Sequence, residues 1–482
     1  MLEAARDFIK AVAESPHAVL LVPDRNTGGI SAGTIVSLTL QLLGKPVDKI
    51  HVYFVQKGLS IFDPREKADF EQFCQKHGIR DIIVLDQSGR RGTEPPITTS
   101  LLPSGSNTPE RKILFISNQY SAPIPNITIL SSSRFNPPIA PTSLLAYTLC
   151  CTLHPTAPDA TALPALVGTL GDPSFPDKLL HSPPVSVYLN TDTVLRKHTT
   201  KWTKLLISLL NITRRSPLTE GNGATRAAWD LLQFDPHANP ADWPTPKKIL
   251  SGTWGSQQLK DIITRLEALQ ERYNAEIDKW KRAPPKFSSD GRVAVIEIAS
   301  PWLIHPLLVG RWLHLLQMKN MQDSSKPRLF AVGIANTKYI QGKVDFTAWR
   351  TAHAIATGVD LIPLLNEYAD KLPSDTKKRV EDFTKGQKEA PGWSLETGIW
   401  EEYRNEGLKL PGRAWRGVAE VAGLGDGKPV MGIQVRIEEK WEKADEEGEG
   451  EGEGEGEVTE VKTLLRSETG AAAEARATGV AE

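Results

Sequence analysis

LLVPDRNTGGISAGTIVSLTL, at residues 20–40, contains an apolar strand, a turn with two adjacent glycines and the start of a helix of small residues. A turn of this kind at the end of a strand lets the backbone approach a phosphate, or places side chains on a metal. The alternative is a tight structural turn in which Gly28 and Gly29 supply unusual φ angles. Because a glycine pair is a weak signal, these residues alone favour the structural interpretation.

Short apolar runs continue along the first half of the chain, and they are typical of strands buried on both faces. They fall at residues 17–22, 50–55, 81–85, 112–116 and 127–130. A helix is expected at residues 63–77, with Asp63 as its cap, Pro64 in its first turn and Gly78 after its end. Strand, helix and strand in this rhythm predict a parallel sheet, whose chemistry lies at the carboxyl ends of its strands.

The rest of the chain predicts further helices and a second α/β part. Helices are expected at residues 141–154, 159–170, 191–214, 224–233, 301–316 and 359–372, and strands at 293–298, 329–335, 343–349 and 430–437. The apolar stripe of residues 257–281 is typical of a core helix or of a spacer between domains. We favour the spacer, because residues 283–290 have the composition of a linker.

Two segments have a biased composition. Residues 88–110 are rich in Pro, Ser, Thr and Gly, which predicts a mobile surface insertion. Residues 445–457 alternate Glu and Gly, so the negative charges repel and the chain entropy is high. We therefore expect the acidic tail, residues 442–482, to be disordered.

The overall composition limits the class of protein. A length of 482 residues predicts two or three domains, and 40% hydrophobic with 24% charged residues is ordinary for a soluble globular protein. The net charge of −1 argues against coating of nucleic acid through bulk charge, although it does not exclude a local basic groove. Cys74, Cys150 and Cys151 are too few for a disulfide framework, which favours a reducing compartment. Without a signal peptide or a long apolar run, we expect a cytoplasmic or nuclear protein that does not enter a membrane.

The glycine turn resembles the first motif of the DHH phosphoesterases, which reads His-x-Asp-x-Asp-Gly-Ile-Ser-Ser/Ala-Gly. The tail of that motif is matched by Gly29, Ile30, Ser31, Ala32 and Gly33. The ligand positions differ, because Asp24 stands at the histidine, Asn26 at the first aspartate and Gly28 at the second.

The later motifs of this family follow in order, also partly matched. The second motif is one aspartate at the end of the next-but-one strand, and Asp86 stands there. The third, Asp-His-His, is replaced by residues that include Asn118 and Gln119, without an acid or a histidine. The Asn-Pro and Thr-Ser pairs that come next are matched at residues 136–137 and 142–143. The fourth motif, a small-residue helix that closes on an aspartate, places Asp172.

The second half resembles the DHH-associated domain of RecJ-type enzymes. Arg350 and Thr351 stand at its Arg-Ser/Thr pair, and Gln387 stands at the histidine of its Gly-Gly-His-x-x-Ala-Ser-Gly loop. The positions of that loop that agree are Gly386, Lys388, Ala390 and Gly392. The resemblance implies an α/β fold with a parallel-sheet DHH-type domain at 1–190, a helical connector at 191–283 and a smaller DHH-associated α/β domain at 284–441.

The family site resembles a two-metal phosphoesterase centre, usually with manganese, and such ions need several carboxylate and imidazole ligands. Only Asp86 and Asp172 remain here at ligand positions, with Asp24 as an acidic replacement for a histidine. The resemblance thus implies vestigial metal ligands that can hold at most one Mg²⁺ or Mn²⁺, largely through water. It implies phosphate binding by Arg350 and Thr351, and by the loop with Gly386 and Lys388.

Each of these residues also has a plainer interpretation. The three aspartates are typical turn and helix-capping residues, and a single arginine on a strand most often forms a surface salt bridge. Four tryptophans of the second half are placed to stack the bases of single-stranded nucleic acid, although core packing is the commoner use. These are Trp302, Trp312, Trp349 and Trp393.

Three functions fit these residues. The first is an inactive DHH protein, a pseudoenzyme that binds single-stranded nucleic acid, a nucleotide or a protein. The second is a working phosphoesterase or exonuclease with one Mn²⁺ or Mg²⁺ at Asp24, Asp86 and Asp172. The third is an interaction factor whose acidic tail recruits basic protein partners. The number of ligands favours the first over the second, and no zinc-hydrolase, serine-hydrolase or P-loop motif suggests another enzyme.

Overall fold

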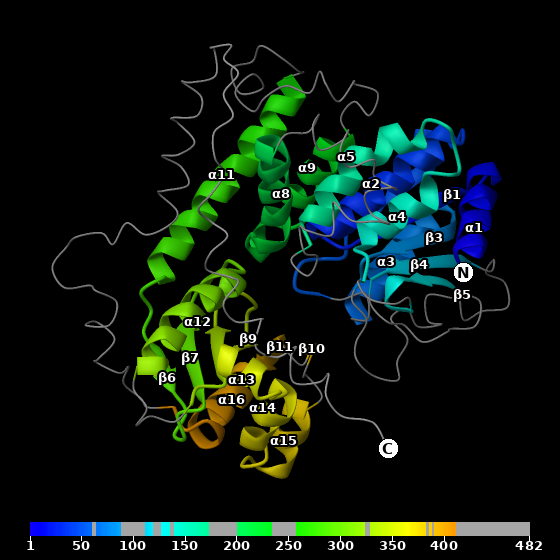
Figure 1. The fold of residues 1–482 in the computed structure, drawn as a ribbon. Coiled ribbons are helices and arrows are strands. Elements are labelled where there is room, and N and C mark those ends of the chain that lie inside the picture. The colour runs from blue at the N-terminus through cyan, green and yellow to red at the C-terminus, as the bar shows by residue number, and fades with distance from the viewer. Residues whose placement is uncertain are drawn as a thin grey trace, which may run out of the picture. The chain divides into compact units, whose positions relative to one another are not determined.

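The computed structural model describes residues 1–59, 64–87, 111–118, 127–134, 139–172, 200–233, 257–322, 328–381, 385–387 and 390–410. All of these belong to one compact unit, Met1–Trp415, and the second unit, Arg416–Glu482, lies outside them. The predictions for residues 88–110, for the strand at 430–437 and for the acidic tail therefore fall outside the described residues. Two sheets organise the described part of the chain (Figure 1).

The first sheet has five parallel strands in the order β2-β1-β3-β4-β5. They are β1 (Ala18–Pro23), β2 (Ile50–Val52), β3 (Ile79–Leu85), β4 (Lys112–Ser117) and β5 (Ile127–Ser131). Nearly every residue of β1, β3 and β4 is buried, which explains the continuous apolar runs of the sequence. The predicted α/β fold with a parallel sheet is confirmed.

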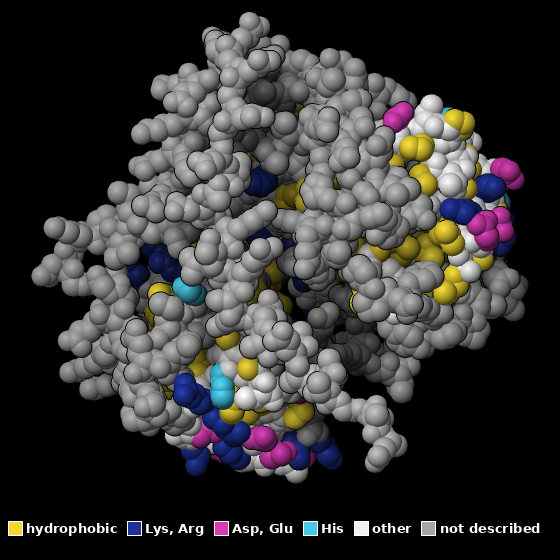
Figure 2. All heavy atoms as spheres, in the orientation of Figure 1, with side chains coloured by type: hydrophobic (Ala, Val, Ile, Leu, Met, Phe, Trp, Pro, Cys, Tyr) yellow, Lys and Arg dark blue, Asp and Glu magenta, His cyan; other side chains and the backbone are white. Residues whose placement is uncertain are grey.

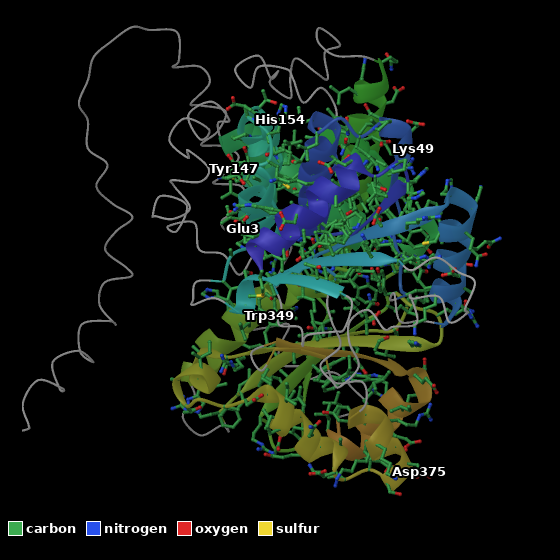
Figure 3. The ribbon with its side chains drawn as sticks, turned by 90° about the vertical axis from the view of Figure 1, so that its right-hand side faces the viewer. Glu3, Lys49, Tyr147, His154, Trp349 and Asp375 are labelled. Carbon is green, nitrogen blue, oxygen red and sulfur yellow. The ribbon has the colours of Figure 1, made fainter. Side chains whose placement is uncertain are left out.

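Helices cover both faces of this sheet. On one face, Phe70 and Cys74 of α3 (Pro64–His77) form a core with alternate residues of β1, including Leu20 and Val22. The other helices are α1 (Leu2–Glu14), α2 (Thr27–Leu42), α4 (Thr142–Cys150) and α5 (Ala157–Leu170). They contact one another, and α1, α2 and α4 also contact strands of the sheet. Glu3 of α1 and Tyr147 of α4 mark this group in Figure 3. Short 3-10 turns are Val47–Lys49, Ser132–Arg134 and Leu218–Glu220.

Small residues allow α2 to pack closely against its neighbours. A Cβ atom at Gly168 of α5 would lie 2.7 Å from the Cβ atom of Ser31 and 2.5 Å from that of Ser143. A Cβ atom at Gly33 would lie 2.7 Å from the ring of Trp229. Real Cβ atoms do not approach other atoms so closely, so this helix needs its small residues for packing.

Three further helices follow: α8 (Thr200–Arg215), α9 (Gly223–Gln233) and α11 (Gln257–Trp280). The apolar stripe of α11 is buried at Leu259, Ile263, Leu266, Leu269 and Tyr273, and α11 contacts α8 and α9. The stripe thus packs as the face of a core helix along this part of α11.

The second sheet has six strands in the order β10-β11-β9-β8-β7-β6, and only the pair β7 and β8 is parallel. They are β6 (Pro285–Phe287), β7 (Val293–Ile298), β8 (Ala331–Asn336), β9 (Lys343–Arg350), β10 (Lys385–Gln387) and β11 (Ala390–Glu396). The predicted linker at 283–290 was wrong for residues 285–287, because this segment pairs with β7 as an edge strand. Helices of this part are α12 (His305–Gln322), α13 (Ala352–Ala356), α14 (Leu361–Ala369), α15 (Ser374–Glu381), α16 (Thr397–Glu402) and a π-helical turn, Tyr403–Gly407.

The tryptophans of the second half serve mainly as core residues. Trp393 stacks on Phe346 with ring centroids 4.8 Å apart inside the core of the second sheet. Trp302 and Trp312 are also buried, whereas Trp349 is partly exposed. A base cannot stack on a ring that the core already covers, so core packing, the commoner use, is confirmed for the three buried rings.

Charges of both signs alternate over the helices of the second part. Figure 2 shows Lys and Arg side chains next to Asp and Glu side chains in the region of α14 and α15. Salt bridges there join Lys377 to Asp370 at 2.7 Å and Arg379 to Glu396 at 2.6 Å. Such interspersed charge is typical of a solvated surface and not of a stripe that binds a polyanion. Within the described residues, no helix combines the length and the apolar character that crossing a bilayer requires.

Candidate functional site

Polar residues follow three neighbouring strands of the first sheet at their carboxyl ends. Asp24 comes directly after β1, Asp86 after β3 and Asn118 after β4. The backbone N–H of Asp24 donates to the carbonyl of Leu85 at 2.8 Å, and that of Asp86 donates to the carbonyl of Ile116 at 2.9 Å. These bonds extend the strand ladder by one residue, so the three side chains stand side by side.

Asn26 connects the carboxylate of Asp24 to the start of α2. It is the N-cap of α2, and its side-chain oxygen accepts a hydrogen bond of 2.6 Å from the backbone N–H of Gly29. Its side-chain nitrogen donates to Oδ2 of Asp24 at 2.7 Å. An aspartate at position 26 would keep the cap but offer no donor, and it would place a second negative charge next to Asp24. The amide therefore suits a site that is not held together by cations.

Gly28 and Gly29 provide space rather than unusual backbone angles. Both lie in the first turn of α2 and neither has a positive φ, so that part of the structural interpretation was wrong. A Cβ atom at Gly29 would lie 2.5 Å from the carbonyl oxygen of Asp24, and one at Gly28 would lie 3.1 Å from Oδ2 of Asp86. The absence of a side chain at Gly28 thus leaves room for the carboxylate of Asp86.

Asp86 has the most perturbed environment of the site. Its backbone is in the left-handed region, with a φ of 59°. The hydroxyl of Thr142, at the start of α4, donates to Oδ1 of Asp86 and accepts from the backbone N–H of Asn118 at 3.1 Å. Burial raises the pKa of Asp86 to about 7, and the negative charges of Asp24 and, less strongly, Asp172 act in the same direction. A neutral Asp86 is therefore well populated at neutral pH.

Asp172 completes the site from a position shortly after the end of α5. The side-chain nitrogen of Asn118 donates to Oδ2 of Asp172 at 3.3 Å. The structure thus brings together Asp24, Asp86 and Asp172, as the resemblance implied, and each accepts a hydrogen bond from a neutral side chain of the chain itself. The donor to Asp86, Thr142, was expected only to open a helix, so its place in the site was missed.

These residues do not fit a pair of metal ions. Two-metal phosphoesterase centres hold their ions about 3.5–4 Å apart and need ligands for both. Among the described residues, no group of three or more His, Cys, Asp or Glu side chains is arranged to hold a metal ion. The hydrogen bonds from Asn26, Thr142 and Asn118 instead satisfy carboxylate oxygens that ions would otherwise coordinate.

Two basic residues that lie near one another carried no sequence signal. The guanidinium of Arg25 is buried and donates to the carbonyl of Val55 and the side-chain oxygen of Asn222. Burial lowers the pKa of Arg25 to about 10. Lys57 donates to the carbonyl of Ser216 at 2.6 Å, and burial, followed by the positive charge of Arg25, lowers its pKa to about 7. Their partners lie on segments distant in sequence, so no local pattern could identify them.

The expected phosphate-binding residues of the second half have other contacts in this structure. Thr351 is the buried N-cap of α13, and its hydroxyl donates to the carbonyl of Leu329 at 2.6 Å. Arg350, at the end of β9, donates to the carbonyl of Val359 at 3.4 Å. Gly386 lies in β10, opposite Pro391 of β11.

Several positions of the motifs have no described side chain. Gln387 is described as backbone of β10, and Gln119, Lys388 and residues 136–137 lie outside the described residues. Phosphate binding by Arg350, Thr351, Gly386 and Lys388 stays a prediction.

Comparison with known proteins gives structural likenesses only. No family model matches this sequence, and neither does any curated protein. Among solved structures, RecJ from Thermus thermophilus in complex with Mn²⁺ is 15% identical, with a TM-score of 0.52 over 84% of this chain and 53% of that chain. An exonuclease RecJ bound to manganese is 14% identical, with a TM-score of 0.53 over 90% of this chain and 97% of that chain.

A third likeness is to the DHH domain of a protein described as a member of a family of ribosomal proteins, at 11% identity. Its TM-score is 0.52, over 85% of this chain and 90% of that chain. The chain spans about half of the length of the Thermus protein. At these identities the likeness establishes a shared fold, and it confirms the fold that the ordered motifs implied.

Proposed function

From its possession of the RecJ and DHH-domain fold, we propose that this chain is a degenerate DHH-superfamily protein that binds its ligand without hydrolysing it. The observation that supports this is the replacement of metal ligands by hydrogen-bond donors. Asn26 stands at the position of a family aspartate and donates to Asp24, and Asn118, in the replaced third motif, donates to Asp172. Exchanging a ligand for a donor removes a negative charge and occupies the neighbouring oxygen, and both effects weaken cation binding.

The ligand that we propose first is single-stranded nucleic acid or a nucleotide. The support is the fold shared with exonuclease RecJ. A protein partner is the alternative ligand for a site without hydrolytic activity.

Cleavage and binding assays test this function directly. A fluorescently labelled single-stranded oligonucleotide is incubated with the full chain and Mn²⁺, and its length and its anisotropy are followed together. We expect binding without cleavage. Manganese-dependent cleavage that Asp86→Ala abolishes and the surface variant Asp7→Ala retains would refute the proposal. Cleavage that survives in Asp86→Ala would identify a contaminating nuclease, because the second motif would then be dispensable.

A working phosphoesterase with a single metal is the second candidate, and the electrostatics of Asp86 favour it. Burial raises the pKa of Asp86 most, and the charges of Asp24 and Asp172 add to it; one divalent ion near the three carboxylates would relieve this added repulsion. Calorimetric titration with MnCl₂ and MgCl₂ separates the candidates. Saturable binding that Asp86→Asn removes and Asp7→Asn retains would support the one-metal centre, whereas no heat at millimolar metal would exclude it.

A further inference from the structure

A pocket of about 300 Å³ lies at the open edge of the first sheet, around the edge strand β2. Its walls come from the second half of α2, the end of α3 and the exposed side of α9. Lys49, labelled in Figure 3, belongs to the turn that leads into β2 and marks this end of the strand. The volume is at the lower end of the range of small-molecule sites.

This pocket is separate from the candidate site at the strand ends. The site surrounds the first turn of α2, where Gly28 faces Asp86, whereas the pocket is lined by Ser37 and Gln41 of the same helix. With a rise of about 1.5 Å per residue, Gly28 and Ser37 are about 14 Å apart along the axis. A ligand in the pocket therefore does not contact the three carboxylates.

The polar lining of the pocket suits an anion. His51, His77 and Arg226 contribute N–H donors, and none of the residues that line the pocket is acidic. Arg226 is exposed and makes no salt bridge within the described part of the chain. The carboxylate of Asp230, one turn further along α9, interacts with its charge but lies outside the lining. The side-chain nitrogen of Gln233 is buried and lacks a hydrogen-bond partner among the described residues. A buried donor in this state lacks an acceptor, and a phosphate oxygen supplies one when the Gln233 side chain turns into the pocket.

The apolar lining of the pocket suits a flat ring. Phe73 packs on His77 with ring centroids 4.5 Å apart, and His51 lies 4.4 Å from His77. These three rings are partly exposed and form a continuous aromatic surface beside the polar groups. Trp229 also lines the pocket, but its ring is buried against Phe54, 6.0 Å away, and against Gly33, so it closes the wall and does not stack a ligand. Aromatic surfaces of this kind stack planar ligands.

We propose that this pocket binds a small ligand that combines a phosphate with a planar ring, the chemistry of a nucleoside monophosphate. Arg226 and the amide of Gln233 hold the phosphate, and the rings of Phe73, His51 and His77 hold the planar group. This site is additional to the ligand proposed for the carboxylate cluster, and it does not depend on that cluster.

Calorimetric titration of the full chain with AMP tests this proposal. Adenosine, which lacks the phosphate, and inorganic phosphate, which lacks the ring, should each bind at least about tenfold more weakly than AMP, because each loses one set of contacts. Arg226→Ala should weaken AMP binding about tenfold or more through loss of a charge-assisted hydrogen bond. Gln233→Ala, a second variant that removes the unpartnered donor, should also weaken it.

Two control variants locate the binding. Arg311→Ala removes an equally exposed arginine on α12 and should leave AMP affinity unchanged. Asp86→Asn changes the carboxylate cluster and should also leave it unchanged. Absence of saturable AMP binding at millimolar concentration, or equal affinity in wild type and Arg226→Ala, would overturn the proposal. Loss of AMP binding in Asp86→Asn alone would assign the nucleotide to the carboxylate cluster, which refutes this pocket and leaves the proposed function standing.

Discussion

Replacement of Asp86 by asparagine should stabilise the protein, although it changes a residue at the centre of the candidate site. Asparagine has nearly the same shape, accepts the hydrogen bond from Thr142 through its side-chain oxygen, and tolerates the left-handed backbone that Asp86 adopts. The substitution removes the ionisable group and exchanges one accepting oxygen for an NH₂ group.

The expected size of the effect comes from the pKa of Asp86, which is about 7 in the folded protein against an ordinary value of 3.8. One pKa unit corresponds to about 1.4 kcal/mol, so keeping this carboxylate ionised costs the folded state about 4 kcal/mol of unfolding free energy. Because the folded state holds the proton more tightly than the unfolded state, this free energy is retained below pH 4. It is lost progressively as the pH rises from about 4 to about 7.

Urea unfolding in EDTA at several pH values between 4 and 8, followed by circular dichroism, measures this difference. Asp86→Asn should exceed wild type by about 4 kcal/mol at pH 8, and the gain should shrink toward zero as the pH approaches 4. The matched control Asp7→Asn, at an exposed position of α1, should stay within about 0.5 kcal/mol of wild type at every pH.

A gain that does not change with pH, or a loss at pH 8, would contradict the reasoning. A loss at pH 8 would mean that the folded protein stabilises Asp86 as an anion through its own hydrogen bonds, because EDTA removes divalent ions. Repeating the experiment with MnCl₂ tests for a metal ion at this position. A metal that binds at Asp86 raises the stability of wild type but not that of Asp86→Asn.

Three other substitutions test described contacts. Gly33→Ala places a Cβ atom 2.7 Å from the ring of Trp229 and should lower the free energy of unfolding by about 1–3 kcal/mol, as measured by urea denaturation; an unchanged midpoint would show that the ring moves freely. Asn26→Asp removes the donor to Asp24 and adds a like charge, so it should destabilise the protein in EDTA by about 1–3 kcal/mol at pH 7, whereas equal stability would show that the hydrogen bond from Asn26 contributes nothing to folding. Burial opposes ionisation of Asp290, but hydrogen bonds from Ser288, Arg292 and Tyr368 outweigh it and lower the pKa of Asp290 to about 2. Because that carboxyl is a third exposed, it should contribute on the order of 1 kcal/mol above pH 4, lost as the pH falls toward 2, and Asp290→Asn should flatten this part of the profile.

The first sheet could be predicted from the sequence because its strands are buried on both faces. Burial of β1, β3 and β4 demands apolar residues at consecutive positions, and such runs are visible without any knowledge of the partner strands. Strands of three residues carry no comparable pattern. The segment of β6 therefore resembled a linker, and β10 was expected as part of a loop, because only pairing with a neighbouring strand defines them.

The candidate site could be predicted only where the ordered motifs of the family resemblance mark its residues. Asp24, Asp86 and Asp172 were identified in this way, and two of them directly follow a strand of the parallel sheet. The hydrogen bonds that determine the chemistry join distant segments, as between Asn118 and Asp172 or between Thr142 and Asp86. The pKa of Asp86 depends on these contacts and on burial, so the sequence alone contains no signal for it.

The positive φ of Asp86 has a consequence for how this position changes in evolution. Most side chains are unfavourable in the left-handed region, and glycine, asparagine and aspartate are the residues that adopt it readily. The backbone conformation therefore limits which residues are tolerated at this position, whatever their role in the chemistry of the site. A lineage that has abandoned hydrolysis would still drift among these three residues, so aspartate is expected to recur there by default. Positions 26 and 28 have ordinary backbone angles, so the backbone does not favour an acid there. Among relatives of this chain, the absence of acids at these two positions should therefore indicate loss of catalysis better than the residue at position 86 does.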